Sequence, residues 1–278
     1  MNTHSKYENL KNTIKSYGSL AIAFSGGVDS TFLLKTAHDV LGDKAVAVTA
    51  KLRFFPESEL NGAIEFCRKE NITHILCDVE ELKIAGVAQN PPDRCYLCKN
   101  EILNKIKQAV NSYNIYDIKY IADGSNSDDD KDYRPGFQAV LEHGIKSPLK
   151  DAGLTKAEIR ELSKELGLPT WNKEYISCLA SRIPYGETIT EEKLGMIEKA
   201  EQLLSDLGFS QIRVRIHDKI AKIARIEINP DEFVKIIEPE ISRKIYEELN
   251  KYGFTYVTLD LNGYKMGSMN VILSEGRL

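Results

Sequence analysis

The sequence predicts an α/β protein, in which a parallel sheet with helices on both faces is followed by a smaller α+β unit. In the first half of the chain, short apolar runs alternate with segments whose apolar residues recur at helical spacing, an order typical of parallel sheets. After about residue 190 the order becomes helix, strand, strand, helix, strand, which is typical of an α+β unit. We therefore expect one domain at residues 1–185 and a second at residues 186–278.

The expected elements of the first domain alternate along the chain. The strands are the apolar runs at 20–24, 44–50, 72–79 and 118–123. The helices are the amphipathic segments at 31–41, 56–70, 101–110 and 154–168. Thr155 is placed to cap the last helix, with Glu158 at the spacing of a capping box. Ligands of parallel sheets bind beyond the carboxyl ends of the strands, so the turns SGGVDS (25–30) and DGSN (123–126) are expected to lie side by side.

The second domain carries a concentrated group of basic residues. Its expected elements are a helix at 190–208, strands at 210–217 and 220–228, a helix at 230–253 and a strand at 254–261. In the first strand, Arg213 and Arg215 alternate with apolar residues, which predicts that both arginines share a solvated face. Lys222 and Arg225 follow closely, so this stripe also suits the binding of a phosphate.

Composition excludes several classes of protein. The chain has 278 residues, with 41 acidic and 37 basic side chains and a net charge of −4, which argues against a surface built to grip a nucleic acid. Its apolar runs are shorter than the roughly 18 to 20 residues of a membrane span, and its N-terminal segment lacks the apolar centre of a signal peptide. We expect a cytoplasmic protein without a membrane partner.

The five cysteines indicate a metal or reactive site. An odd number of cysteines in a cytoplasmic protein argues against a disulfide framework. Cys67 and Cys77 fall on an expected helix and strand, so we expect them in the core. Cys95 and Cys98 form a CxxC pair in a polar loop, and Cys178 lies in an irregular segment. Three thiolates on a 4Fe-4S cluster leave one iron open, whereas zinc with a fourth ligand is the alternative.

The turn SGGVDS suits a phosphate. Gly26 and Gly27 let backbone N–H groups approach an anion closely at the start of a helix, and Ser25 and Ser30 add hydroxyl donors. The turn lacks the lysine of a Walker loop, so it is not built to transfer a γ-phosphate. Asp29 would repel a phosphate unless Mg²⁺ neutralised it, which predicts a contact between a metal and pyrophosphate.

The turn resembles the pyrophosphate loop of the PP-loop ATP pyrophosphatases, whose fold is the adenine-nucleotide α-hydrolase arrangement. Six further segments resemble the LarE-type sulfur transferases of that superfamily: NPPDRCYLCK, DGSNSDDDKDYRPG, LTKAEIRELSKELGLPTWNK, SCLASRIPYGETIT, RVRIH and LNGYKMGSMN. The likeness spans nearly the whole chain. It implies an enzyme that adenylates a carboxylate of a pyridinium biscarboxylate mononucleotide with ATP and replaces it with a thiocarboxylate, in the synthesis of the nickel-pincer nucleotide.

The resemblance also implies roles for particular residues. It implies that ATP and Mg²⁺ bind at the turn, at Ser25, Gly26, Gly27, Asp29 and Ser30, with further contacts from Gly124, Lys99 and Arg134. Arg213 and Arg215 would hold the substrate phosphate, and Glu201 and Asp231 resemble acids of the same site, although both fall on polar helix faces.

Two modes of sulfur delivery remain open. The three cysteines, Cys95, Cys98 and Cys178, resemble those of the cluster-dependent enzymes. In those enzymes the open iron of a 4Fe-4S cluster can hold a sulfide, which comes from free sulfide or from a sulfur donor. In the alternative, Cys178 gives up its own sulfur and becomes dehydroalanine. We expect the second domain to bind the substrate and to mediate assembly into a homo-oligomer.

Three other functions share parts of this pattern. A tRNA thiolase also pairs such a turn with three cysteines, but it needs a surface that binds RNA. Nothing in the chemistry of an ammonia-using amide synthetase explains three cysteines. A nucleotide sensor without enzymatic activity would bind ATP and release no pyrophosphate.

Overall fold

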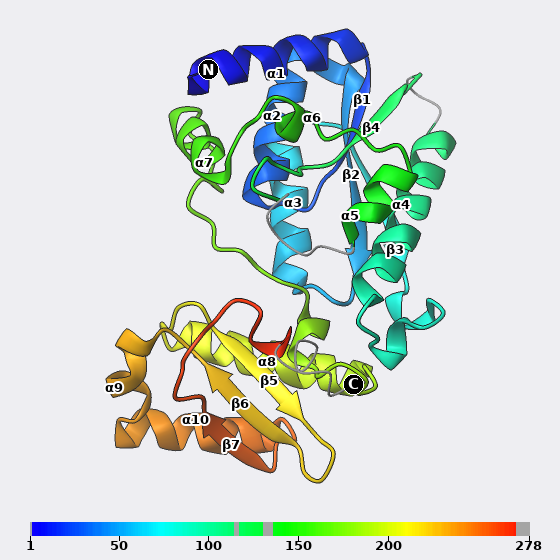
Figure 1. Ribbon diagram of the computed structural model, residues 1–278. Coiled ribbons are helices and arrows are strands. Elements are labelled where there is room, and N and C mark those ends of the chain that lie inside the picture. Colours follow the sequence, from blue (N-terminus) through cyan, green and yellow to red (C-terminus); the bar gives the residue numbers. More distant parts are fainter. Residues whose placement is uncertain (1, 114–116, 130–135, 271–278) are drawn as a thin grey trace. The chain divides into compact units, whose positions relative to one another are not determined.

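The computed structural model describes residues 2–113, 117–129 and 136–270 (Figure 1). The described chain divides into two compact units. The first unit comprises the residues up to 52 together with 57–80 and 95–175. The second comprises 53–56, 81–94 and the residues from 176 onward.

The first unit is built on a parallel sheet. Its four strands run in the spatial order β3-β2-β1-β4. They are β1 (Leu20–Ala23), β2 (Ala45–Leu52), β3 (His74–Val79) and β4 (Tyr120–Ala122). Ala21 of β1 is paired with Val46 of β2 on one side and with Ile121 of β4 on the other. Because β1 and β4 are parallel neighbours, the turns that follow them leave the same edge of the sheet.

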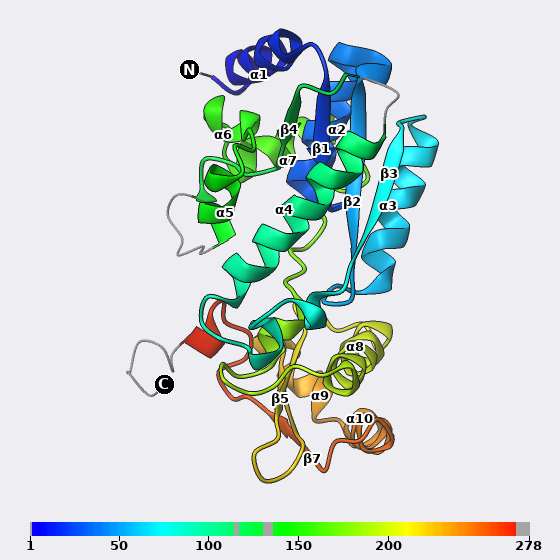
Figure 2. The same cartoon turned by 90° about the vertical axis from the view of Figure 1, so that its right-hand side faces the viewer.

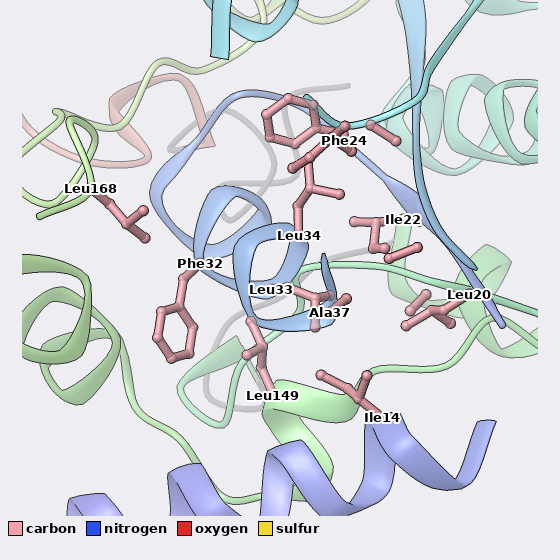
Figure 3. Close-up of a cluster of buried hydrophobic side chains, with 14 of the residues drawn as sticks. Ile14, Leu20, Ile22, Phe24, Phe32, Leu33, Leu34, Ala37, Leu149 and Leu168 are labelled. Atoms are coloured by element: carbon pink, nitrogen blue, oxygen red, sulfur yellow. The ribbon is translucent and has the colours of Figure 1, made fainter. Parts of the chain in front are cut away.

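Helices cover both faces of this sheet, as predicted. They are α1 (Thr3–Tyr17), α2 (Val28–Leu41), α3 (Glu57–Lys69), α4 (Arg94–Ser112), α5 (Gly136–Glu142), α6 (Pro148–Asp151) and α7 (Lys156–Glu165). On one face, Leu20 and Ile22 of β1 pack in a cluster with Ile14 of α1 and Phe32 of α2 (Figure 3). On the other face α4 lies along the sheet and contributes Leu103 to a second cluster (Figure 2).

The start of α7 confirms the capping box read from the sequence. The hydroxyl of Thr155 accepts the backbone N–H of Glu158, and the Glu158 carboxylate accepts the N–H of Thr155. This reciprocal pair fixes where the helix begins. Lys156 is therefore the first helical residue.

Helix α4 begins earlier than expected. The sequence predicted a helix at 101–110 after a polar loop, whereas α4 already starts at Arg94 and so includes the CxxC pair. Contacts with the end of α5 and the turn after it stabilise these first turns: the hydroxyl of Tyr96 donates to Glu142, and His143 is hydrogen-bonded to Asn100. The polar composition of the segment hid the helical period.

None of the helices in the described ranges is long and apolar enough to cross a bilayer.

The second unit has the predicted order of elements, except that the helix expected at 230–253 is divided into two. The elements are α8 (Glu191–Asp206), β5 (Arg213–His217), β6 (Ile223–Glu227), the short α9 (Phe233–Ile236), α10 (Pro239–Lys251) and β7 (Tyr256–Leu259). The sheet has the order β5-β6-β7, with β5 and β6 antiparallel and β6 and β7 parallel. Helix α10 contacts both α8 and β7.

The second unit begins before the boundary expected at residue 185. Two earlier segments belong to it, because hydrogen bonds join them to the chain after residue 176. The carbonyl of Phe54 accepts the N–H of Leu179. The amide of Asn90 donates to the carbonyls of Ile183 and Pro184. Bonds between segments so far apart leave no local pattern in the sequence.

Candidate functional site

The turn between β1 and α2 presents backbone groups at the start of a helix. Gly26 has φ +70°, and a Cβ at this position would lie 3.3 Å from the Cβ of Ala63, so glycine is required. Gly27 caps α2 with an extended backbone and has no side chain to bond the first-turn N–H groups. Such groups, together with the helix dipole, favour an anion.

The two serines of the turn bond to each other. Their Oγ atoms are 3.0 Å apart, and the N–H of Gly27 lies 3.4 Å from the Oγ of Ser25. Ser30 is buried, whereas Ser25 is exposed. The serines therefore organise the turn itself, and the Ser25 hydroxyl is accessible to a ligand.

The turn after β4 lies beside this turn, as its position in the sheet predicted. A Cβ on Gly124 would lie 2.9 Å from the backbone nitrogen of Ser30, so only glycine allows this approach. The side-chain amide of Asn126, which is buried, donates to Asp29 at 3.3 Å. The turns SGGVDS and DGSN thus meet through both backbone and side chains.

The structure adds a residue that the sequence reasoning missed. The ammonium group of Lys156 donates to Asp29 and forms an ion pair with it. Lys156 reaches Asp29 from the first position of α7, where the capping box of Thr155 holds it. Its place directly after a helix cap was visible in the sequence, but its approach to the turn depends on tertiary packing.

Lys173 is a second cation at the turn. Its Nζ donates to the carbonyl of Gly26 at 3.1 Å and pairs with Glu59 at 2.9 Å. The side chains of Lys173 and Glu59 are 26% and 15% exposed, so this pair is partly withdrawn from water. Lys156 and Lys173 each pair with a carboxylate at the turn, so they offset negative charge where an anion would bind.

Two other predicted ligands of ATP are Lys99 and Arg134. Lys99 lies on α4 beside Cys98. Its Cβ faces Gly136 at the start of α5, where an added Cβ would lie 3.6 Å away. Arg134 lies outside the described residues. The roles of both residues stay predictions.

The prediction that Cys67 and Cys77 lie in the core is confirmed for Cys67 and in part for Cys77. Cys67 is 1% exposed and belongs to the cluster under α2, where burial raises the pKa of its thiol to about 12. Cys77 is half-buried against the cluster under α4, and burial also raises its pKa. A high pKa keeps a thiol protonated and therefore inert.

The other three cysteines are divided between the two units. Cys95 is exposed and Cys98 is half-buried, and both lie in the first turns of α4 within the first unit. Cys178 is half-buried and belongs to the second unit. Within the part of the chain that the structure describes, no group of three or more His, Cys, Asp or Glu side chains is arranged to hold a metal ion. The cluster on these cysteines stays a prediction.

The solvated strand face expected for Arg213 and Arg215 is wrong. The two residues are only 8% and 5% exposed. The guanidinium of Arg215 donates to the fully buried Glu227 at 2.8 Å, and that of Arg213 lies 5.0 Å from the ring centre of Tyr264. Burial lowers the pKa of Arg213, with a further contribution from Arg182. Partners from distant segments, which the period of the strand does not reveal, make this burial possible.

One donor of this arginine pair is unused. The Nε–H of Arg215 is buried and has no hydrogen-bond partner among the described residues. A buried donor without a partner is costly, and an anionic ligand would satisfy it. Burial also places both guanidinium groups in surroundings of low dielectric, where a hydrogen bond to an anion would be stronger than in water.

Comparison with known proteins decides the family. No family model matches the chain. An uncharacterised protein of Synechocystis is 40% identical over 98% of this chain and 99% of its own length. The pyridinium-3,5-bisthiocarboxylic acid mononucleotide synthase of Lactiplantibacillus plantarum is 35% identical over 95% of this chain and 94% of its own length. The chain belongs to the LarE family.

Membership of the LarE family confirms the fold class and the prediction of an enzyme. A LarE protein is an ATP-dependent sulfur transferase of the PP-loop superfamily. The wider superfamily is represented by the glutamine-hydrolysing GMP synthase of Thermoplasma volcanium, one of whose subunits is 26% identical over 89% of this chain and 78% of its own length. In this LarE protein the β1–α2 turn is the PP-loop.

Proposed function

We propose that this protein converts a carboxylate of a pyridinium biscarboxylate mononucleotide into a thiocarboxylate during synthesis of the nickel-pincer nucleotide. The observation that carries the proposal is the PP-loop, with Asp29, Asn126 and Lys156 at its edge, in a chain that matches a bisthiocarboxylic acid mononucleotide synthase along its length. The name of that relative supports a pyridinium mononucleotide as the substrate.

The first step is adenylation. A carboxylate oxygen of the substrate attacks the α-phosphorus of ATP, and pyrophosphate leaves with the electron pair of the broken bond. The N–H groups of Gly26 and Gly27 and the hydroxyls of Ser25 and Ser30 bind the departing pyrophosphate. Asp29 is an oxygen donor of the kind that Mg²⁺ prefers, and it would hold this ion, which neutralises phosphate charge when bound. Gly124, Lys99 and Arg134 are proposed to make further contacts with ATP.

The second step is sulfur transfer. A sulfide nucleophile attacks the carbonyl carbon of the acyl adenylate, AMP leaves, and the product is a thiocarboxylate with the release of one proton. Adenylation makes this attack possible because it replaces a charged oxygen with a good leaving group. Arg213 and Arg215 are proposed to hold the substrate phosphate, a role that the unused Nε–H of Arg215 supports.

We propose Cys95, Cys98 and Cys178 as ligands of a 4Fe-4S cluster. Cys95 and Cys98 are separated by three positions on α4, so they share one helix face and fit a common metal site. Arg94, which precedes Cys95, donates to the carbonyl of Ala180, a close neighbour of Cys178 in the chain. A cluster with one open iron supplies a binding place for sulfide, which lets the protein act repeatedly.

Anaerobic purification followed by iron and sulfide quantification and an electronic spectrum tests the cluster. We expect about four irons per chain with a visible absorption band. The variant C95A should lose both iron and multiple-turnover activity, whereas C77A, which replaces a thiol packed against the core, should keep them. If C95A keeps full turnover, or if no iron is found, the cluster is excluded. The sacrificial mode then predicts a loss of about 34 Da at Cys178, one H₂S per chain.

The function as a whole is tested by pyrophosphate release with and without the pyridinium mononucleotide. The proposal requires substrate-dependent release and a sulfur-containing product. ATP binding without pyrophosphate release would indicate a nucleotide sensor instead. Tight binding of tRNA with a steep dependence on salt would favour a tRNA thiolase.

A further inference from the structure

A buried arginine holds the segment that carries Cys178. Arg182 is 1% exposed and lies at the end of the short 3₁₀ turn Leu179–Arg182, which follows Cys178 directly. Its Nη1 lies 3.0 Å from the carbonyl oxygen of Ser177 and 3.1 Å from that of Cys178. One guanidinium group therefore bonds to the backbone on both sides of the Cys178 side chain.

Glu201 fixes that guanidinium group. The two oxygens of its carboxylate accept bonds of 2.8 Å from Nε and Nη2 of Arg182, the paired geometry that gives arginine its strongest contacts. Glu201 lies on α8, on a helix face that the sequence indicated as polar, and its side chain is only 16% exposed. A buried charge pair of this kind is specific in geometry even where its net stabilisation is small.

The same carboxylate ties the segment to the strand of candidate phosphate ligands. Glu201 also accepts the backbone N–H of Val214 at 2.9 Å, between Arg213 and Arg215 on β5. Arg215 in turn donates to the carbonyl of Ser181 at 3.1 Å. Two connections thus join the Cys178 segment to β5.

We propose that Arg182 and Glu201 are positioning residues that fix Cys178 at a set distance from the substrate-phosphate ligands. The inference rests on the proposed function, in which Arg213 and Arg215 hold the phosphate and Cys178 serves sulfur transfer. The phosphate and the reacting carboxylate lie at different ends of the mononucleotide. A fixed separation between β5 and Cys178 would therefore hold the two ends of the substrate at their respective sites, and neither Arg182 nor Glu201 needs to touch it.

The test compares three variants. In R182M/E201L both charges are replaced by apolar groups of similar size, a change that buried ion pairs often tolerate. R182K keeps the charge but loses the planar fork of the guanidinium group. It replaces the double variant in the test if that variant does not fold. The matched control is K193M on the same helix, because Lys193 is also buried but bonds to Asp218 and the carbonyl of Thr188.

Hydrogen exchange gives a readout that does not depend on activity. The N–H of Ser181 bonds to the carbonyl of Cys178. We expect the amide hydrogens of the peptide that covers 177–183 to exchange at least about tenfold faster in R182M/E201L than in the unmodified protein. Their exchange rate should be intermediate in R182K and unchanged in K193M. Unchanged exchange in R182M/E201L or, where that variant does not fold, in R182K overturns the positioning role.

The two half-reactions give the second readout. In R182M/E201L the ratio of thiocarboxylate formed to pyrophosphate released should fall by about 10- to 100-fold, the scale of a small misplacement of a reacting group. An equal fall of both steps overturns the inference. If the unmodified protein forms no thiocarboxylate, the proposed function fails, and the exchange measurement alone decides whether Arg182 positions the segment.

Discussion

Lys156 neutralises a carboxylate inside a turn that suits phosphate. Asp29 would repel an incoming ATP molecule, and the ammonium group of Lys156 offsets that charge before any metal binds. Both side chains are partly exposed, at 34% for Lys156 and 21% for Asp29, so each remains able to exchange its partner for a phosphate or a magnesium ion. The pair therefore makes the turn less repulsive to an anion.

Replacing Lys156 by methionine should slow adenylation. We expect substrate-dependent pyrophosphate release to fall by about 10- to 100-fold, because one cation is lost beside the developing charge. The matched control is K164M on the same helix, since Lys164 packs over the ring of Trp171 and does not pair with Asp29. A variant K156M with unchanged pyrophosphate release would contradict this role.

His217 is held in its neutral form in the folded protein. Burial lowers its pKa below the ordinary 6.5, and Arg225 and Arg215 lower it further, while Glu227 opposes them. The Nε2 atom of His217 accepts a bond from Nε of Arg225 at 3.2 Å, which requires that this nitrogen carries no proton. The unfolded chain therefore binds a proton at a higher pH than the folded chain does.

Acid should destabilise the protein through His217. A depressed folded pKa contributes stability that is present above about pH 6.5 and is lost as the pH falls through the lower folded value. The variant H217Q keeps an acceptor for Arg225 but does not titrate. Urea unfolding at about pH 7.5 and about pH 5 should show a smaller loss of free energy of unfolding in H217Q than in the unmodified protein. Equal losses would show that His217 does not set this dependence.

At the scale of elements, the contact between the β4 turn and the start of α2 depends on one glycine. A Cβ at Gly124 would meet the backbone of Ser30 and Asp29, at 2.9 Å from the Ser30 nitrogen and 3.3 Å from the Asp29 carbonyl carbon. We expect G124A to lower the free energy of unfolding by about 1 to 3 kcal/mol, because neither backbone segment can yield without moving an element.

The same change should weaken ATP binding by about tenfold, since it displaces the first turn of α2 from its anion-binding geometry. Calorimetric titration with ATP and Mg²⁺ measures this directly. G62A is the matched control, because a Cβ on Gly62 of α3 meets nothing within 4 Å and the change favours the helix. Similar ATP affinity in both variants would contradict the role of the close approach.

Most elements were predictable because their signals are local. The parallel sheet, the capping box of α7 and the mixed order of the second unit follow from apolar period and cap residues near each other in the chain. The start of α4 was missed because polar residues mask its period and contacts from Glu142 and His143 complete it. The helix α1 (Thr3–Tyr17) was not predicted either, although Leu10 and Ile14 anchor it in the core.

The candidate site was predictable only in part, because some of its contacts join segments that are distant in the chain. Gly26, Asp29 and the neighbouring DGSN turn follow from a motif and from strand order. The approach of Lys156 to the PP-loop and of Arg182 to Glu201 arises from segments brought together by tertiary packing. Burial of an arginine depends on such distant partners, so strand period alone gave the wrong exposure for Arg213 and Arg215.

At the scale of the whole molecule, an acidic chain gathers basic side chains at two places. The net charge is −4, yet Lys156 and Lys173 lie at the PP-loop of the first unit. Arg213 and Arg215 lie with Arg182 in the second unit. Local cations on an acidic protein suit small anionic ligands better than a long polyanion, whose remaining charge would be repelled. This arrangement is consistent with the proposed binding of one phosphorylated ligand by each unit.

If ATP binds at the PP-loop, it should stabilise the first unit. Trp171, the single tryptophan of the chain, lies in the first unit, and its backbone N–H donates to the carbonyl of the core residue Leu168. Its fluorescence therefore follows the unfolding of the unit that contains the PP-loop. ATP with Mg²⁺ at about 100 times its dissociation constant should raise the midpoint of thermal unfolding by roughly 5 to 10 °C, and EDTA should remove most of the shift.

Hydrogen exchange locates the effect and separates the two units. ATP with Mg²⁺ should protect peptides that cover 25–30 and 123–126, because it binds the N–H groups of those turns. Inorganic phosphate, a small probe of the arginine site, should instead protect the peptide that contains β5. If ATP protects β5 and leaves the PP-loop unchanged, the nucleotide binds in the second unit, and the assignment of adenylation to the first unit is wrong.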